Sequence, residues 1–286
     1  MMVYLALFLA GIASGFMAGL LGIGGGFVMV PVLILLLPML GIDPGLVPKA
    51  AVATSLAAMV PTACSAVFAQ YRRGALDITW VRRLTPAAAI GAVIGSQVAA
   101  AVNGRWVAMV FVIYTACIAL KMARAPDTDV KAARIADAFP APLVGGVIGT
   151  FASMAGVGGA GLTVPFLLSA RVEMKRSLAV SSAVGLAIAL AGGAGFAIAS
   201  SPMSTGSLEL IGFIHWPAAL MIAVSATVLA PSGVCAAHML PVVHLKRAFA
   251  AVLVAACTIT LAKAANTTGL VDYAVASPAT AVASRN

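Results

Sequence analysis

The segment Gly19-Leu-Leu-Gly-Ile-Gly-Gly-Gly-Phe-Val-Met-Val-Pro31 places a cluster of glycines inside a long apolar stretch. A glycine in the interior of a helix costs about 0.5–1 kcal/mol relative to alanine, so several together predict that the helix breaks here. We expect one apolar helix before the break, over residues 3–21, and a shorter one after it, over residues 27–37. The glycines at the break are Gly22, Gly24, Gly25 and Gly26.

The same pattern returns in the second half of the chain, as Ala155-Gly-Val-Gly-Gly-Ala-Gly-Leu-Thr-Val-Pro165. The two copies keep one constant offset of 134, both for their prolines (165 − 31) and for the glycines at 156, 158 and 159. The chain therefore contains an internal duplication. Glycine-interrupted apolar segments at corresponding positions of two halves are typical of transporters whose binding site is built from broken helices.

The composition predicts an integral membrane protein. Of the 286 residues, 62% are hydrophobic and 9% are charged, and the mean hydropathy is +1.10. Apolar runs of about 20 residues recur, which is the length a helix needs to cross the hydrocarbon layer. The net charge of +9 comes from lysines and arginines in short loops between those runs. Such a distribution indicates membrane topology, and we expect no nucleic-acid partner.

The cysteines and histidines do not form a catalytic or metal-binding pattern. The cysteines lie singly inside apolar segments, and no histidine has a carboxylate at ligand spacing. No acidic residue lies in the middle of an expected span, which argues against an intramembrane aspartyl protease or a di-metal enzyme. We therefore expect no enzymatic activity, no cofactor and no metal. The residues concerned are Cys64, Cys117, Cys235, Cys257, His215, His238 and His244.

The duplication divides the chain into two expected repeats, residues 1–124 and 139–265, with a polar connector at residues 125–138 and a loose tail at residues 266–286. After its broken segment each repeat continues with three spans. In the first repeat these spans cover residues 50–69, 84–102 and 106–122. In the second repeat the broken segment covers residues 140–155 and 162–169, and the spans cover residues 178–199, 215–239 and 245–264.

The distribution of basic loops predicts that the repeats are inverted. The loops at residues 72–83 and 171–176 and the connector carry basic residues and should be cytoplasmic. The second broken segment then enters and leaves on one side as a hairpin. Because three spans follow each hairpin, the first hairpin enters from the opposite side. The loop at residues 200–211 contains Glu209 but no lysine or arginine, which fits an external position.

The predicted fold class is therefore all-α: a polytopic membrane protein of about ten helical segments, with two inverted repeats that each combine a glycine-broken helical hairpin with three spanning helices. Within the first helix, Gly11, Gly15 and Gly19 are spaced by four residues. That spacing predicts a ridge of small residues on which another helix packs closely.

The helices that begin after the two breaks should present free backbone N–H groups and the positive ends of their dipoles, which bind anions. Hydroxyls follow each break, since the sequence aligns Thr54 and Ser55 with Ser181 and Ser182 at an offset of 127 (181 − 54). Neutral donors can hold an anion weakly enough to release it. The expected substrate-binding residues are Gly24, Gly25, Gly26, Thr54, Ser55, Gly158, Gly159, Ala160, Gly161, Ser181 and Ser182.

Two cations, Lys49 and Arg176, are expected to attract the anion at opposite mouths of this site. Structural interpretations stay open for all of these polar residues. Serine and threonine hydroxyls commonly bond to a neighbouring helix or to their own backbone. A lysine or arginine near a helix end commonly extends its charge to the membrane surface.

Several of these motifs together resemble the TauE/SafE sulfite exporter family of membrane permeases, over nearly the whole chain. They are the glycines at 22–26 with Val30-Pro31, residues 49–55, the basic loop Tyr71-Arg-Arg-Gly74 and the second copy at residues 156–165. The resemblance implies a multi-pass protein of the bacterial inner membrane, surrounded by lipid, that transports a small organosulfur anion or sulfur oxyanion. Sulfite, sulfonates and sulfoacetate are such anions. This sequence departs from the symmetric pattern at Ala160 and Ser181, which replace Gly26 and Thr54 in the second copy.

From these features we expect a secondary carrier that works by alternating access around the two hairpin tips. Two alternatives stay open: a channel-like anion pathway, and a membrane factor that assembles or anchors a partner without transport. The direction of transport, the coupling ion and the oligomeric state are not predicted.

Overall fold

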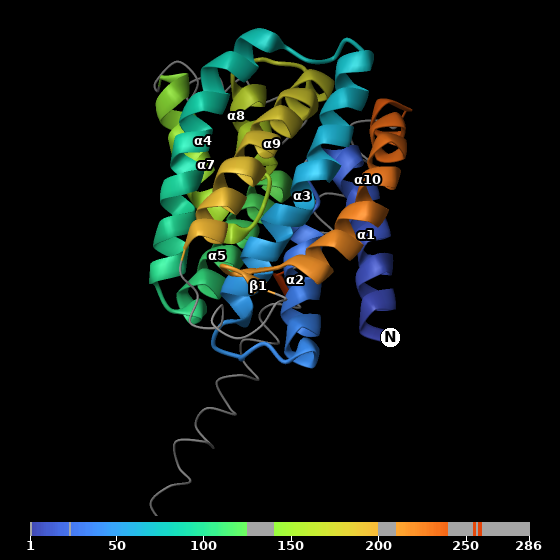
Figure 1. Ribbon diagram of the computed structural model, residues 1–286. Helices are drawn as coiled ribbons and strands as arrows, with labels where there is room; N and C mark the ends of the chain where they lie inside the picture. Colours follow the sequence, from blue (N-terminus) through green and yellow to red (C-terminus); the bar gives the residue numbers. More distant parts are fainter. Residues whose placement is uncertain are drawn as a thin grey trace, which may run out of the picture.

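The computed structural model describes residues 2–22, 24–124, 140–199, 210–239, 254–255 and 257–258, and shows a bundle of long helices (Figure 1). The first half consists of α1 (Met2–Leu21), α2 (Gly26–Leu36), the 3₁₀ helix η1 (Leu37–Leu40), α3 (Val47–Arg72), α4 (Ile78–Ala101) and α5 (Gly104–Arg124). The second half consists of α7 (Ala141–Ala155), α8 (Ala160–Ser169), α9 (Met174–Ile198), the short antiparallel strands β1 (Leu210–Ile211) and β2 (Ile214–His215), and α10 (Trp216–Met239).

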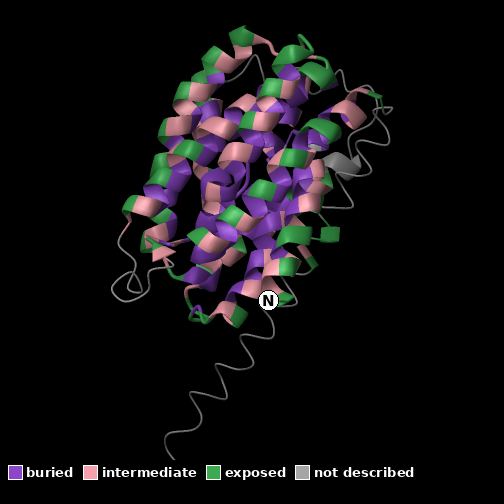
Figure 2. Ribbon diagram, turned by 45° about the vertical axis from the view of Figure 1, so that its right-hand side comes forward, coloured by how far each residue is buried: buried purple, intermediate pink, exposed green. Residues whose placement is uncertain are grey.

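The described helices confirm the prediction of an all-α polytopic membrane protein. Five of them, α1, α3, α4, α9 and α10, are long and apolar enough to cross a membrane. The helices α2, α7 and α8 are apolar but shorter, with 11, 15 and 10 residues. Buried residues concentrate where helices face one another, and exposed ones lie on the outer surface of the bundle and at its ends (Figure 2). The connector, most of the span expected at residues 245–264 and the tail fall outside the described residues.

Both helices break at the predicted glycines because the backbone there enters the left-handed region. Gly25 and Gly159, the residues directly before α2 and α8, have φ angles of 83° and 72°. Gly22 and Gly156, which follow α1 and α7, have φ angles of 64° and 70°. Glycine adopts these angles without the steric conflict that a Cβ creates. The two breaks therefore share a left-handed glycine at both equivalent pairs of positions, although Gly24, with a φ of 75°, has no left-handed counterpart at Gly158.

Several helices begin earlier than predicted. The helices α2 and α8 start at residues 26 and 160 rather than 27 and 162, and α3, α4 and α9 start at residues 47, 78 and 174 rather than 50, 84 and 178. The prediction followed apolar runs, whereas charged residues lie near the starts of the three long helices: Lys49 in α3, Arg82 and Arg83 in α4, and Lys175 and Arg176 in α9. In α4 the start is fixed locally, because Asp77 Oδ1 accepts hydrogen bonds from the backbone N–H groups of Thr79 and Trp80.

One end of the bundle, which we call the Lys49 face, is where α3 and α10 begin and α4 and α9 end. The Lys49 ammonium donates to the carbonyl oxygen of Ala100 at the end of α4. The backbone N–H of Phe213, just before α10, donates to the carbonyl oxygen of Phe196 near the end of α9. The Lys49 ammonium also lies 5.4 Å from the centroid of the Phe213 ring, and this contact joins the two pairs of helix ends.

The opposite end, which we call the Arg176 face, is where α4 and α9 begin and α3 and α10 end. Lys175 in the first turn of α9 donates to the carbonyl oxygen of His238 near the end of α10. The His238 ring lies 3.0 Å from Gln70 Oε1 near the end of α3, measured from Nε2. The long helices α3, α4, α9 and α10 thus all run from one face to the other.

The glycine ridge of α1 packs on α10, as predicted. Gly11 lies against Ile222, and Gly19 lies against Ala230. The two helices therefore run in the same direction, and α1 begins on the Lys49 face. Figure 1 shows them side by side.

The corresponding helix of the second half, α7, packs on α4 instead. Gly145 lies against Leu84, and Gly149 lies against Ala88, so α7 begins on the Arg176 face. The contact of Gly145 with Leu84 repeats the contact of Gly11 with Ile222. Gly145 is the equivalent of Gly11 at the offset of 134 (145 − 11), and Ile222 is the equivalent of Leu84 at an offset of 138 (222 − 84). The two hairpins enter from opposite faces, and the first helix of each packs on the equivalent long helix of the other half. This is the arrangement of inverted repeats.

Candidate functional site

The two glycine turns, which we call the hairpin tips, meet inside the bundle. Gly24 and Gly158 are equivalent residues of the two tips, and a Cβ on Gly24 would stand 3.7 Å from the Gly158 Cα. A Cβ on Gly26 would collide with the carbonyl oxygen of Gly156. The structure thus brings the predicted tip residues together. All of them are buried: Gly24, Gly25, Gly26, Gly158, Gly159, Ala160 and Gly161.

Each tip is bonded to a serine of the opposite half. The Ser55 hydroxyl on α3 donates to the carbonyl oxygen of Gly156 at 2.9 Å. The Ser181 hydroxyl on α9 donates to the carbonyl oxygen of Gly22 at 3.1 Å, and also to that of Leu178 at 2.8 Å. Gly22 and Gly156 are equivalent, so the two serines occupy equivalent places across the tips.

This exchange corrects the alignment of the hydroxyls. The sequence paired Ser55 with Ser182, but the contacts pair Ser55 with Ser181, at an offset of 126 (181 − 55). Successive residues of a helix point about 100° apart, so a shift of one residue changes the neighbour that a side chain meets.

The other two predicted hydroxyls have different partners. Thr54 Oγ1 accepts the backbone N–H of His215 at 3.0 Å, which joins α3 to β2. Ser182 donates to the carbonyl oxygen of Leu178 in its own helix at 3.0 Å, the back-bonding that the sequence left open. At the corrected offset Thr54 is equivalent to Val180, so the second half has no hydroxyl at that position.

Lys49 lies inside a contact and not at an open mouth. Its side chain is nearly buried, its ammonium donates to Ala100 O at 2.7 Å, and the charge lies 5.4 Å from the ring centroid of Phe213. Its equivalent is Lys175, which donates to His238 O at 3.1 Å. In both halves, therefore, a lysine binds the carbonyl end of a long helix, where the helix dipole favours a positive charge.

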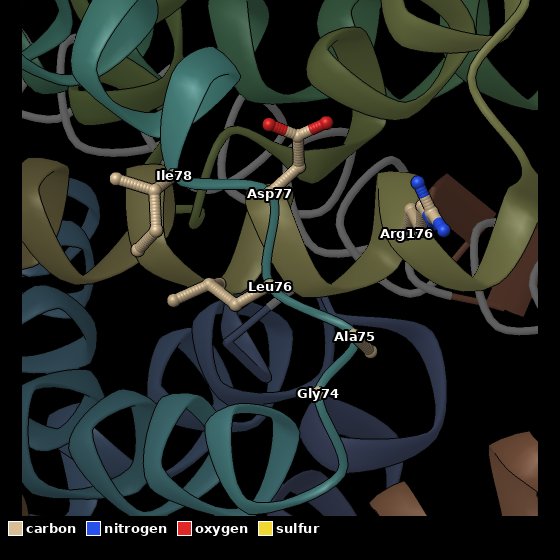
Figure 3. A pocket seen from close by; sticks show the side chains of 6 residues that line it. All are labelled: Gly74, Ala75, Leu76, Asp77, Ile78 and Arg176. Carbon is tan, nitrogen blue, oxygen red and sulfur yellow. The ribbon is translucent and has the colours of Figure 1, made fainter.

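Arg176 differs from Lys49 because it is open to solvent. Its side chain is 60% exposed, and its Nε lies 3.9 Å from a carboxylate oxygen of Glu173. It lines a shallow pocket of 270 Å³ together with the connection between α3 and α4 (Figure 3). Figure 3 shows the Asp77 carboxylate and the Arg176 guanidinium on different walls of this pocket. Its lining residues are Gly74, Ala75, Leu76, Asp77, Ile78 and Arg176.

The Lys49 face has the strands β1 and β2 at the equivalent place, in the connection between α9 and α10. Phe213 and His215 of this ribbon are 3% and 1% exposed. The Phe213 ring meets the ring of Phe196 edge to face, with centroids 6.4 Å apart. The sequence predicted only an external loop here, because a ribbon of two-residue strands leaves no periodic pattern. The ribbon thus belongs to the connection that is equivalent to the one lining the pocket on the other face.

The sequence also gave no signal for Met59. Its side chain lies against Gly24 and Gly26 of the first tip. The equivalent residue at the same offset of 126 is Gly185, which lies against the carbonyl oxygen of Gly158. A methionine among apolar residues is ordinary in a membrane helix, so only the three-dimensional contact reveals its position beside a tip.

The comparisons with known proteins cover both halves of the chain and both hairpin tips. Residues 7–260 match the family model described as sulfite exporter TauE/SafE. The chain belongs to the TauE/SafE family. A relative from Haemophilus influenzae, described as a "probable membrane transporter protein", is 30% identical over 248 residues, which are 86% of this chain and 93% of the relative. A second "probable membrane transporter protein", from Methanocaldococcus jannaschii, is 27% identical over 225 residues, 76% of this chain and 80% of the relative. No solved structure matches the chain.

The TauE/SafE match includes both hairpin tips, the serines that bond to them, and the lysines at the two faces of the bundle. The family consists of membrane transporters and not enzymes, and this chain is a multi-pass membrane protein; both relatives are described as probable membrane transporters. The resemblance inferred from the glycine motifs is therefore confirmed. The family name also implies a sulfur oxyanion as the class of substrate.

Proposed function

We propose that this TauE/SafE protein is a secondary transporter that moves a small sulfur-containing anion across the bacterial inner membrane by alternating access. Sulfite, a sulfonate or sulfoacetate is the expected class of substrate. One observation carries the proposal: two helix N-termini from oppositely oriented halves meet at buried tips, and Ser55 and Ser181 bond each tip to the other half.

The chemistry of the tips suits an oxyanion. At the first residue of each helix, Gly26 in α2 and Ala160 in α8, the backbone N–H has no acceptor within its own helix, and the helix dipole places about half a positive charge at this end. The residues before these helices, Gly25 and Gly159, carry no side chain that could cap them. An anion between the tips would therefore accept hydrogen bonds from two sets of backbone donors.

Ser55 and Ser181 can serve two states of such a site. In the structure, each hydroxyl donates to a glycine carbonyl of the opposite tip. With substrate, rotation of the hydroxyl group directs the same proton to the anion, and the glycine carbonyl is released. Binding then loosens the contact between the halves, which alternating access requires.

The two faces support a closed side and an open side. The ribbon of β1 and β2 bonds to α3 on the Lys49 face, whereas the Arg176 face has the pocket, and we propose that the ribbon closes the Lys49 face. Basic residues gather at the Arg176 face, where α3 ends and α4 begins, so the positive-inside rule makes it cytoplasmic. These residues are Arg72, Arg73, Arg82 and Arg83. We propose that the halves, residues 1–124 and 139–265, rock about the tips and open the two faces in turn.

Uptake of radiolabelled sulfite and of a panel of sulfonates into proteoliposomes tests the function. A carrier gives saturable uptake and counterflow, in which unlabelled anion inside accelerates entry of the label. Flux that rises linearly with concentration and shows no counterflow would support the channel-like pathway. Absence of flux for every anion would support the membrane assembly factor and contradict the proposal.

A further inference from the structure

One face of α5 contacts both hairpin helices near the tips. The ring of Phe111 lies 6.5 Å from that of Phe27, which is the second residue of α2, measured between centroids. About two turns further along α5, the Ile118 side chain fills the space beside Gly161, the second residue of α8. This face of α5 therefore contacts the first turns of both hairpin helices, α2 and α8.

Two hydroxyl residues, Tyr114 and Thr115, lie on α5 between these contacts. Each is three or four residues from both Phe111 and Ile118, the spacing that places side chains on one side of a helix. The Tyr114 ring stacks on Phe27, with centroids 6.1 Å apart and planes 16° apart. Tyr114 is 7% exposed and Thr115 is fully buried.

Among the residues that the structure describes, neither the Tyr114 hydroxyl nor the Thr115 hydroxyl has a hydrogen-bond partner. Buried polar groups in native proteins are nearly always paired, so two adjacent exceptions beside one site require an explanation. The serines at the tips differ in this respect, because Ser55 and Ser181 both donate to glycine carbonyls.

We propose that Tyr114 and Thr115 contact the transported anion, with their hydroxyls donating to its oxygens when it lies between the tips. The inference rests on the proposed function and assigns further donors to the same site. Both groups are neutral donors, like the serines and the backbone N–H groups, so they add hydrogen bonds without fixing the anion by charge. The two unpaired hydroxyls are then groups whose partner arrives with the substrate.

The test compares Tyr114→Phe and Thr115→Val with two control variants, Thr85→Val and Thr227→Val. The controls also remove buried hydroxyls that lack a partner in the described structure, but they lie on α4 and α10. For each purified full-length variant, the KM for uptake of sulfite and of methanesulfonate into proteoliposomes and the melting temperature are measured. Losing one hydrogen bond to a charged group should raise the KM about tenfold or more.

We expect Tyr114→Phe and Thr115→Val to raise the KM in this way while their melting temperatures stay at or above that of the wild type. Removal of an unpaired buried hydroxyl does not destabilise a protein, so a drop in melting temperature would show a structural role and overturn the inference. A KM equal to that of the controls would overturn it as well. If the wild type transports no anion, the proposed function fails first; if the wild type transports and Tyr114→Phe keeps its KM, only this inference fails.

Discussion

The two halves of the chain are alike at the tips and differ beside them. Both tips have glycines in the left-handed region at equivalent positions, and both are bonded to a serine of the opposite half. Beside the tips, Met59 is replaced by Gly185 and Thr54 by Val180. The shared features hold the two tips together, and the unshared threonine binds the ribbon on the Lys49 face.

This contrast has a simple physical meaning. In an inverted repeat, exchanging the conformations of the two halves converts one open face into the other. Elements common to both halves must therefore work in both states, whereas an element present in only one half makes the two faces unequal. The tips belong to the first class, and the contacts of the ribbon with Thr54 and Lys49 belong to the second.

The largest effect is expected from Gly25→Ala. The residue has a φ of 83°, and its new Cβ would stand 2.9 Å from the carbonyl oxygen of Ser14. The left-handed backbone costs about 1–2 kcal/mol for a residue with a Cβ. Overpacking typically adds about 1–3 kcal/mol. We expect loss of transport and a clear fall in melting temperature.

Gly41→Ala is the matched control for that variant. Gly41 has a φ of 81°, but no atom lies within 4 Å of the added Cβ, so only the backbone strain remains. Transport should persist. Equal losses in the two variants would show that the crowding of the tip has no special part in transport.

A smaller effect is expected from Ser181→Ala, and it should exceed that of Ser182→Ala. Only Ser181 reaches the opposite tip, whereas Ser182 bonds to its own helix. The loss of about 1–1.5 kcal/mol for a hydrogen bond corresponds to roughly a tenfold fall in uptake at low anion concentration. Ser182→Ala should stay within about twofold of the wild type. A larger effect of Ser182→Ala than of Ser181→Ala would support the offset of 127 suggested by the sequence and contradict the offset of 126 (181 − 55) found in the structure.

Thr54→Val should weaken the attachment of the β1–β2 ribbon to α3 on the Lys49 face, because it removes the acceptor for the His215 N–H. Hydrogen exchange at the His215 amide, followed by mass spectrometry, should become about tenfold faster, because the ribbon opens more often. Thr62→Val is the control, since Thr62 is a buried threonine of the same helix that bonds only to Ala58 O. Unchanged exchange in Thr54→Val would mean that other contacts hold the ribbon.

The smallest effect is expected at the open face, from Arg176→Gln. An exposed cation attracts an anion weakly, so the KM for anion supplied from the Arg176 face should rise only about twofold at low salt. The difference should vanish near 1 M salt, where the screening length is about 3 Å. Arg171→Gln removes an exposed charge of the same face that does not line the pocket. An equal rise in both variants would point to the overall charge of the face and not to the pocket.

The sequence was sufficient to predict the broken helices, their duplication and the packing ridge of α1. Each of these depends on glycine, whose effects on the backbone and on close packing are strong and local. The register of the hydroxyls was predicted wrongly by one residue. By residue type, Thr54-Ser55 aligns best with Ser181-Ser182. The offset in the structure depends instead on how the preceding loops place α3 and α9.

Other features of the site could not be read from sequence for a related reason. The ribbon before α10 and the position of Met59 beside Gly24 arise from contacts between segments far apart in the chain. The burial of Lys49 has the same origin, since its partners are Ala100 and Phe213. A single sequence without such contacts predicts only that a lysine lies near a helix end.

The central claim is that the tips of the two halves form one anion site, and a double-mutant cycle tests it most directly. Sulfite uptake by proteoliposomes would be measured for the wild type, Ser55→Ala, Ser181→Ala and the double variant. If both serines act on one bound anion, each single variant raises the KM and their effects are coupled by more than the roughly 0.3–0.5 kcal/mol expected of independent sites. Unchanged KM values, or effects that add within that range, would contradict a shared site.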